Sequence, residues 1–130
     1  MKTILTTGGT GFIGSHTCLV LLNAGFNIVI LDSFLNSSER ILQRISQSTN
    51  LKNVDGSERV KFYKGDVRDT SIIDLIFSEA ELNKNPIFSV IHFAGLKAVG
   101  ESSMIPLDYW EVNVCGTINI LKIMNKYNCT

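Results

Sequence analysis

Short apolar runs alternate along the chain with longer stretches in which apolar residues recur at helical spacing. The runs are predicted as strands at residues 3–6, 27–32, 60–64 and 87–94. The run at 27–32 is apolar almost throughout, which is typical of a parallel strand covered on both faces. Each run is followed by a segment whose apolar residues recur every three or four positions, as on one face of a helix.

Helices are predicted at residues 13–24, from residue 39, after residue 69 and at 107–127. Residues 39–59 indicate a helix followed by a loop, with a polar surface insertion at 46–58 and a turn at Asp55-Gly56. The buried stripes expected for the other three helices are Ile13, Thr17, Val20, Leu21 and Ala24; Ile73, Ile76, Phe77 and Ala80; and Val114, Thr117, Ile118, Leu121 and Met124.

This order of elements repeats a strand–helix unit four times. Such alternation predicts an α/β protein with a parallel sheet and helices on both faces, a Rossmann-like doubly wound arrangement. The 130 residues match the length of one domain and are enough to bury a core.

A glycine-rich turn, Thr7–Gly14, joins the first strand to the first helix. This is the context in which a turn binds the pyrophosphate of a dinucleotide at a helix N-terminus. Gly11 would admit the pyrophosphate, and Gly14 would let the helix pack closely. Both Gly9-x-Gly11-x-x-Gly14 and Gly8-x-x-Gly11-x-x-Gly14 fit, so spacing does not choose between the two dehydrogenase patterns, and an ordinary βα turn is the alternative.

Asp32 ends the second strand, 18 residues after Gly14. A carboxylate at about that distance accepts hydrogen bonds from the adenosine ribose, and it would repel a 2′-phosphate, so it favours NAD over NADP. An aspartate in a solvated turn is the alternative. Ser33, Asn36 and Ser37 follow and offer further polar contacts to ribose or phosphate.

Asp66 and Val67 follow the third strand, where strand ends line the ligand crevice of such a sheet. Asp66 is a candidate acceptor for the adenine amino group, with Val67 packed on the ring. The alternative is a helix cap at Asp69 with Asp66 in the preceding turn. The two interpretations are compatible.

Histidines and cysteines do not indicate a metal site or a nucleophile. His92 lies within an apolar strand without an adjacent acid, which favours a core histidine with satisfied nitrogens over a catalytic one. His16 and the cysteines at 18, 115 and 129 do not complete a metal set with it. Three reduced, mostly buried thiols are typical of a cytosolic protein.

The amino-acid composition argues against several classes of binding partner. Hydrophobic residues make up 45% and charged residues 18% of the chain, and 12 basic residues balance 12 acidic ones. A nucleic-acid or anionic membrane surface would need a basic excess, so neither partner is expected. No apolar run approaches the ~20 residues of a membrane span. The N-terminus lacks a signal-peptide pattern, and the expected location is the cytoplasm.

Four stretches resemble a known family. They are His-Phe-Ala-Gly-Leu-Lys-Ala-Val-Gly-Glu-Ser at 92–102, Thr-Gly-Gly-Thr-Gly-Phe-Ile-Gly-Ser-His-Thr at 7–17, Gly-Asp-Val-Arg at 65–68 and Asn-Val-Cys-Gly-Thr at 113–117. Together they closely resemble the UDP-glucose 4-epimerases, which are extended short-chain dehydrogenases/reductases. The first stretch is far more specific than a glycine turn, and the resemblance covers the chain except the polar insertion.

The resemblance implies NAD as cofactor and assigns residues to its parts. Those expected at the pyrophosphate are Gly8, Gly11, Phe12 and Ile13. Those expected on the ribose side are Asp32, Ser33, Asn36 and Ser37, and those at the adenine are Asp66 and Val67. Those expected along the central and nicotinamide half are Phe93, Ala94, Gly95 and Lys97. Lys97 would pair with a phosphate, and a solvent-facing lysine is the alternative.

The activity implied is interconversion of UDP-glucose and UDP-galactose through a 4-keto sugar, with the base in a Tyr-x-x-x-Lys pair. No such pair occurs in the 130 residues. The resemblance therefore implies that residues 1–130 are the N-terminal NAD-binding domain, without catalytic residues or substrate domain, and we expect this fragment alone to be inactive. A nucleotide-sugar dehydratase or decarboxylase on the same fold, or a non-catalytic NAD-binding module, are the alternatives.

The resemblance also implies a homodimer that pairs through the helix predicted at 107–127. Apolar residues outside the expected core stripe of this helix would face the partner, namely Tyr109, Trp110, Val112, Ile120 and Ile123. The alternative is that this surplus is covered by other parts of the same protein.

Overall fold

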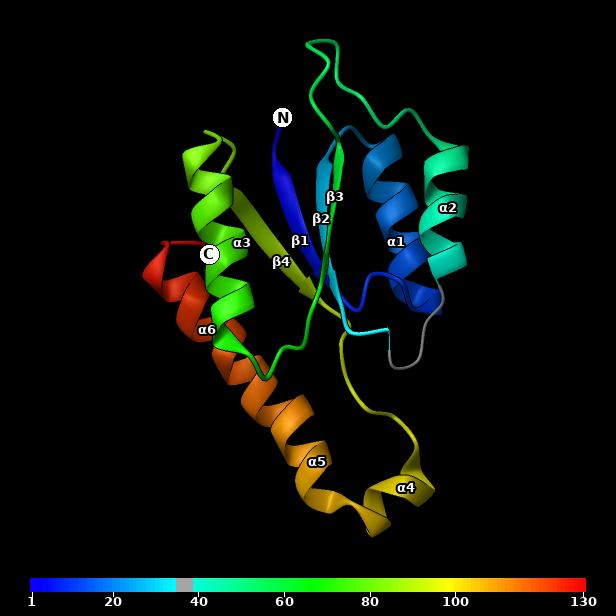
Figure 1. The fold of residues 1–130 in the computed structure, drawn as a ribbon, viewed down its shortest axis with the longest axis vertical. Coiled ribbons are helices and arrows are strands. Elements are labelled where there is room, and N and C mark those ends of the chain that lie inside the picture. Colours follow the sequence, from blue (N-terminus) through cyan, green and yellow to red (C-terminus); the bar gives the residue numbers. More distant parts are fainter. Residues whose placement is uncertain (35–38) are drawn as a thin grey trace.

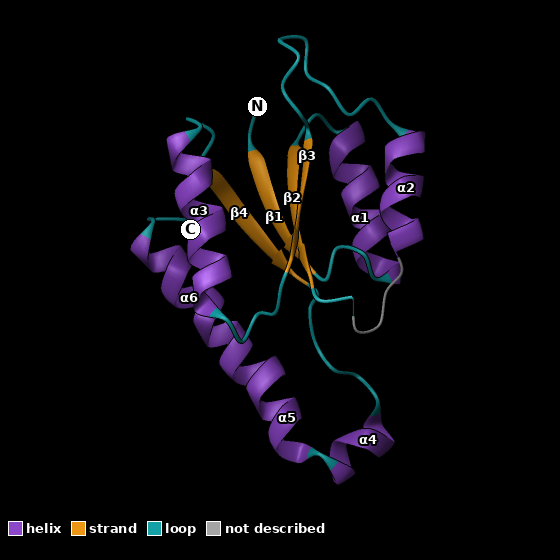
Figure 2. Cartoon of the chain, in the orientation of Figure 1, coloured by secondary structure: helices purple, strands orange, loops and turns teal. Residues whose placement is uncertain are grey.

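A computed structural model describes residues 1–34 and 39–130. Its strands and the helices between them are β1 (Thr3–Thr7), α1 (Phe12–Asn23), β2 (Asn27–Asp32), α2 (Glu39–Ser48), β3 (Val60–Lys64), α3 (Thr70–Leu82) and β4 (Ile87–His92). They are followed by α4 (Val99–Met104), α5 (Pro106–Trp110), the π-helical segment η1 (Glu111–Cys115) and α6 (Gly116–Lys126). Figures 1 and 2 show α5, η1 and α6 as one continuous rod.

The strands form one parallel sheet in the order β3-β2-β1-β4. The chain moves outward from β1 to β2 and β3, then crosses to the other side of β1 to form β4. Thr7, the last residue of β1, therefore lies between Leu31 of β2 and His92 of β4. This topology confirms the Rossmann-like prediction, and it places a topological switch point between β1 and β4, where such sheets bind ligands.

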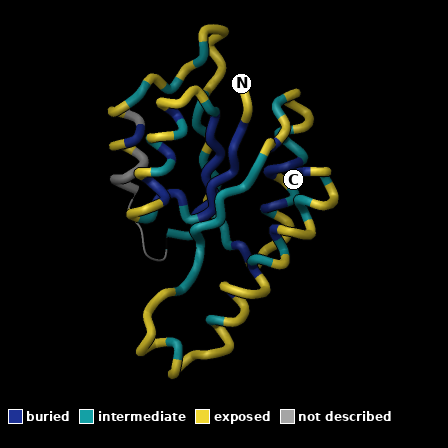
Figure 3. The backbone as a smooth tube through the Cα atoms, turned by 180° about the vertical axis from the view of Figure 1, so that it is seen from behind, coloured by how far each residue is buried: buried dark blue, intermediate teal, exposed yellow. Residues whose placement is uncertain are grey.

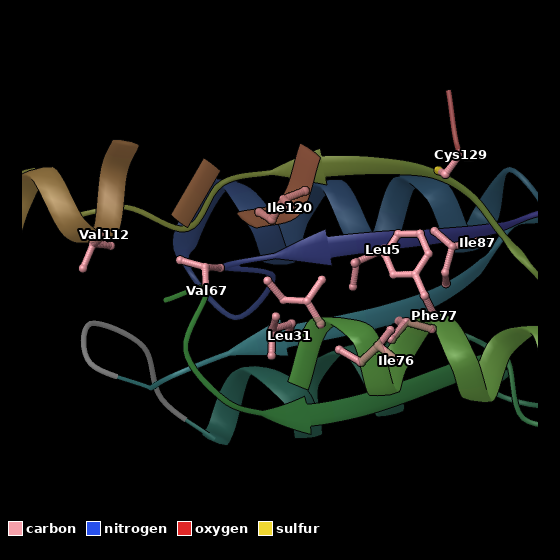
Figure 4. Packing of buried hydrophobic residues seen from close by; sticks show 11 residues of the cluster. Leu5, Leu31, Val67, Ile76, Phe77, Ile87, Val112, Ile120 and Cys129 are labelled. Atoms are coloured by element: carbon pink, nitrogen blue, oxygen red, sulfur yellow. The ribbon is translucent and has the colours of Figure 1, made fainter. Parts of the chain in front are cut away.

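Alternate side chains of the central strands point to opposite faces of the sheet, where they form two apolar layers. Ile4, Ile28 and Ile30 pack with Cys18 and Leu22 of α1. Figure 4 shows the second layer, on the opposite face of the sheet, which α3 and α6 cover. It includes Leu5 and Leu31 of the strands, Ile76 and Phe77 of α3 and Ile120 of α6. Figure 3 shows that the central strands are buried. The stripe predicted for α3 is confirmed, because Ile73, Ile76 and Phe77 are buried and Ala80 packs against them.

The face predicted for α1 is wrong for most of its residues, although Leu21 packs against the core as expected. Its buried residues are Gly14, Ser15, Cys18 and Leu22, whereas Ile13 and Val20 are 59% and 67% exposed. Apolar residues occur around most of this helix, so periodicity alone does not select the inner face. Close packing of Gly14 against the glycine turn selects it, as described below.

The face predicted for the last helix is also wrong for most of its residues, although Met124 packs against the core as expected. Val114, Ile118 and Leu121 of the expected core stripe are 39–57% exposed, while Ile120, expected to face a partner, is 3% exposed. Val112, expected beside it, is likewise buried. The π-helical turn at Glu111–Cys115 contains more residues per turn than an α-helix and therefore shifts the register of the faces on either side of it.

The loop predicted after the second helix is present, but it begins later than the insertion predicted at 46–58, because α2 continues to Ser48. Residues 49–59 form this loop, with an isolated antiparallel bridge between Lys52 and Glu58. The short helix α4 was not predicted. Over residues 1–34 and 39–130, no helix combines the length and the apolar character that crossing a bilayer requires.

The corrected face of α1 predicts a contrast between two neighbouring residues. Leu22 is 1% exposed and Val20 is 67% exposed. We expect Leu22→Ala to lower the free energy of unfolding by about 2–5 kcal/mol because it leaves a cavity. Val20→Ala is the matched control and should change it by no more than about 0.5 kcal/mol. Urea unfolding followed by circular dichroism measures both, and equal losses would contradict the assignment.

Candidate functional site

A groove of about 710 Å³ lies at the carboxyl ends of the strands. Its walls are the glycine turn after β1, the segments that follow β2, β3 and β4, and α5. The predicted site residues that line it are Gly8, Gly11, Phe12, Asp32, Ser33, Asp66, Val67, Phe93, Ala94, Gly95 and Lys97. Ile13 is not part of the lining, and Asn36 and Ser37 fall outside the described residues. A hollow of about 50 Å³ at the opposite end of the strands is too small for a dinucleotide.

The glycine turn is shaped by close main-chain contacts. Gly8 has φ +66°, and a Cβ atom there would lie 2.7 Å from the nitrogen of Ala94. A Cβ atom on Gly14 would lie 2.3 Å from the carbonyl oxygen of Gly8. The first turn of α1 therefore rests directly on the main chain of the loop. Gly11, the residue before the helix, supplies no side-chain cap, so the first N–H groups of α1 can serve an anion.

Asp32 is buried at the end of β2, with 7% of its surface exposed, so the solvated-turn alternative is wrong. Its Oδ2 accepts the N–H of Thr10 at 3.0 Å and its Oδ1 accepts the N–H of Phe34 at 2.8 Å. The carboxylate thus ties the glycine turn to the segment that follows β2.

Asp66 and Arg68 form a close pair on the next wall. The guanidinium donates to both carboxylate oxygens at 2.7–3.1 Å. These hydrogen bonds hold the pKa of the Asp66 carboxyl below its usual range, so it remains an ionised acceptor. Asp69 caps α3 by accepting the N–H of Ser71 at 2.9 Å, which confirms the predicted cap. Val67 is buried beneath the groove.

Several lining residues were not predicted from the sequence, namely Leu31, Gly65, Arg68, Leu96, Ala98, Glu101, Ile105, Asp108, Tyr109 and Val112. Many of them come from the segment after β4, from α4 and from α5, which extend beyond the carboxyl ends of the strands (Figure 1). Tyr109 is the tyrosine of the groove, but its hydroxyl is bonded to the main chain of Ala98. Desolvation, together with the charge of Glu101, raises the pKa of Tyr109, so this hydroxyl is unsuited to act as a base.

His92 has partners at both ring nitrogens, as predicted for a core histidine. Thr7 Oγ1 lies 2.5 Å from Nδ1, and Thr117 Oγ1 lies 3.1 Å from Nε2. Because the Thr117 hydroxyl donates to the carbonyl of Asn113 at 2.7 Å, Nε2 donates to Thr117 and Nδ1 accepts from Thr7. Desolvation holds the pKa of His92 below its usual value and keeps the ring neutral. His92 therefore joins the end of β1 to α6.

The protein is a Rossmann-like protein of the dinucleotide-binding class. The class is defined by the order of the strands, by the glycine turn and by the buried Asp32 at the end of β2. A family model described as GDP-mannose 4,6 dehydratase matches residues 5–130. The chain belongs to that family.

Individual relatives confirm the resemblance found in the sequence. The UDP-glucose 4-epimerase of Neisseria meningitidis serogroup A is 52% identical over 124 residues, which are 95% of this chain and 33% of that protein. The UDP-glucose 4-epimerase of Schizosaccharomyces pombe is 47% identical over 126 residues, which are 97% of this chain and 32% of that protein. The chain thus spans about a third of the length of these relatives.

Solved structures agree with this result. The UDP-glucose 4-epimerase of Stenotrophomonas maltophila, with bound NAD and formylated UDP-arabinopyranose, has a TM-score of 0.84 and 35% identity, covering 100% of this chain and 35% of that one. The enzyme of Bifidobacterium longum, in complex with NAD+ and UDP, has a TM-score of 0.82 and 43% identity, covering 98% of this chain and 34% of that one.

The neutral state of His92 predicts a pH dependence of stability. Its folded pKa is lowered, so the unfolded state takes up the proton first as the pH falls. The contribution is complete above the unfolded pKa of about 6.5 and is lost as the pH falls through the folded pKa. We expect the difference in free energy of unfolding between wild type and His92→Gln to shrink over this range. Urea titrations at stepped pH measure it, and a constant difference would contradict the assignment.

Proposed function

We propose that this chain is the NAD-binding portion of a UDP-glucose 4-epimerase, which interconverts UDP-glucose and UDP-galactose through a 4-keto intermediate. The observation that carries the proposal is the juxtaposition of a buried strand-end carboxylate, Asp32, with an uncapped helix N-terminus at Gly11, in one groove. A dinucleotide requires both, one for its ribose and one for its pyrophosphate. Relatives named as UDP-glucose 4-epimerases, including structures with NAD, support the choice.

The parts of NAD are assigned to residues of the groove as the sequence predicted. The pyrophosphate would lie at the start of α1, against Gly8, Gly11 and Phe12, with the exposed Ile13 beside it. The adenosine ribose would be held by Asp32 and Ser33, together with Asn36 and Ser37. Asp66 and Val67 would receive the adenine. Phe93, Ala94, Gly95 and Lys97 would line the central and nicotinamide half.

Bound NAD would supply the capacity to take up a hydride from the sugar and to return it. The residues of this chain hold and orient the cofactor for that exchange. Asp66 stays ionised, and the adenine amino group would share its carboxylate oxygens with Arg68. We assign no proton acceptor within residues 1–34 and 39–130, because the groove tyrosine, Tyr109, is bonded to the main chain and its pKa is raised.

A nucleotide-sugar dehydratase is the second candidate, because the matching family model carries that description. The protein expressed from its complete reading frame distinguishes the two. Given UDP-galactose, an epimerase forms UDP-glucose with no loss of mass. A dehydratase loses water from its nucleotide sugar. Formation of a dehydrated product without epimerisation, detected by mass spectrometry, would overturn the proposal. The epimerase function would place the protein in galactose metabolism, and its unpaired cysteines accord with a cytoplasmic location.

NAD is expected to bind in preference to NADP because the carboxylate of Asp32 would repel a 2′-phosphate. We expect Asp32→Ala to weaken NAD binding by about 1–3 kcal/mol, since polar groups lose their partner. The same substitution should reduce the ratio of the affinity for NAD to the affinity for NADP. Isothermal titration calorimetry measures both affinities. Asp55→Ala, at an exposed loop aspartate, is the matched control and should bind as wild type. Tighter binding of NADP by the wild type would refute the ribose assignment.

A homodimer is proposed through the outer face of the rod formed by α5, η1 and α6. This face carries exposed apolar residues at helical spacing, namely Leu107, Trp110, Val114, Ile118 and Leu121. Of the residues expected from the sequence, Trp110 belongs to this face. Val112 and Ile120 are buried, Tyr109 lines the groove and Ile123 packs against the core. An exposed apolar stripe of this length is typical of an interface, and a twofold axis would pair it with its own copy.

The dimer proposal predicts that charge on this stripe separates the subunits. Sedimentation velocity should show a concentration-dependent dimer for the wild type and a monomer for Ile118→Glu or Leu121→Glu. Circular dichroism should remain unchanged, because both side chains are exposed. Val54→Glu introduces the same charge at another exposed apolar residue, in the 49–59 loop, and should leave the dimer intact. Dimers that persist in both stripe variants would place the interface elsewhere.

A further inference from the structure

Residues 93–98 form one wall of the groove but belong to neither a helix nor a strand. The main-chain groups of such a segment still need hydrogen-bond partners. The first two residues find them at the end of β1: Phe93 donates its N–H to the carbonyl of Thr7 at 2.9 Å, and Ala94 donates to the Thr7 hydroxyl at 3.3 Å. Further along, the partners are side chains of the rod.

Two side chains one helical turn apart hold this segment. Asn113 accepts the N–H of Leu96 through Oδ1 at 2.8 Å and donates from Nδ2 to the carbonyl of Leu96 at 3.0 Å. The Tyr109 hydroxyl accepts the N–H of Ala98 at 3.0 Å and donates to the carbonyl of Ala98 at 2.8 Å. Both main-chain groups of two alternate residues are therefore bonded, as they would be by a neighbouring strand.

Lys97 lies between these two anchored residues and lines the groove. Within residues 1–34 and 39–130, its ammonium group has neither an ion pair nor a hydrogen bond. A lysine side chain loses considerable rotamer freedom when it binds an anion. Anchoring the main chain on either side of it reduces the freedom that remains to be lost, because only the side chain has to be ordered.

A third residue on the same face of the rod forms a hydrogen bond with the sheet. Thr117, four residues after Asn113, bonds to His92 at the end of β4. Tyr109, Asn113 and Thr117 thus recur at every fourth residue and bond in turn to Ala98, Leu96 and His92. The residue after each of them, namely Trp110, Val114 or Ile118, belongs to the exposed apolar stripe.

We infer that Tyr109 and Asn113 are positioning residues for Lys97: by bonding the main chain of Leu96 and Ala98 they hold the ammonium in the groove for an anionic group of the dinucleotide. Neither residue needs to touch the ligand. The inference rests on the proposed NAD-binding function, and it deepens that function by assigning a role to a helix that is distant in sequence from the glycine turn.

The test is a double-mutant comparison with NAD as the probe. Tyr109→Phe and Asn113→Ala should each raise the Kd of NAD by on the order of three- to tenfold, the effect of losing the pre-ordering of one flexible side chain. In a Lys97→Ala background the same substitutions should have no effect on the Kd. A general loosening of the groove would weaken binding equally in both backgrounds, so the comparison separates positioning from stability.

Tyr63→Phe is the matched control, because it removes a tyrosine hydroxyl that bonds to Glu79 instead of to the groove. It should leave the Kd unchanged. Thermal unfolding of each variant checks its fold, and Tyr109→Phe, which keeps the ring, decides the matter if Asn113→Ala does not fold.

The outcomes distinguish a failure of the proposed NAD-binding function from a failure of the positioning role. If the folded wild type fails to bind NAD, the proposed function and the inference both fall. If the wild type binds NAD and Asp32→Ala weakens binding, the function stands. In that case a wild-type Kd for Tyr109→Phe, or an equal loss with and without Lys97, overturns the positioning role alone.

Discussion

Main-chain crowding at the carboxyl end of β1 is the constraint on which the rest of this structure depends. Gly8 passes so close to Ala94 that a Cβ atom would lie 2.7 Å from its nitrogen, and Gly14 lies even closer to Gly8. These contacts bring the start of α1 and the exit of β4 to one point. The groove opens there because the chain departs in opposite directions from neighbouring parallel strands.

One helical rod connects the walls of this groove. Asn119 donates to the carbonyls of Val67 and Arg68, after β3, at 3.1 and 3.2 Å, and Asn113 holds Leu96 after β4. The outer face of the same rod carries the exposed apolar stripe. The proposed cofactor site and the proposed subunit contact therefore share a rigid element, and the π-helical turn within it sets which residues serve each face.

Much of the groove was predictable from short patterns, because its parts are local. The turn from Gly8 to Gly11, Asp32 and Asp66 all follow predicted strands, and the carboxyl ends of parallel strands meet at one edge. Tyr109 and Asn113 carried no comparable signal. Their roles arise from hydrogen bonds to residues 11 and 17 positions earlier in the chain, and no periodicity in the sequence encodes such a pairing.

The sequence by itself determined the strands, their parallel arrangement and the glycine turn, because continuous apolar runs and glycine spacing have few structural solutions. It also determined which residues of α3 are buried, since that helix is apolar on one side. Only the tertiary structure decided the inner faces of α1 and α6. Helix α1 carries apolar residues around most of its surface, so packing of Gly14 against the turn decided the choice of Leu22 over Val20. For α6, the π-helical turn before it and its contact with α3 decided the choice of Ile120 over Leu121.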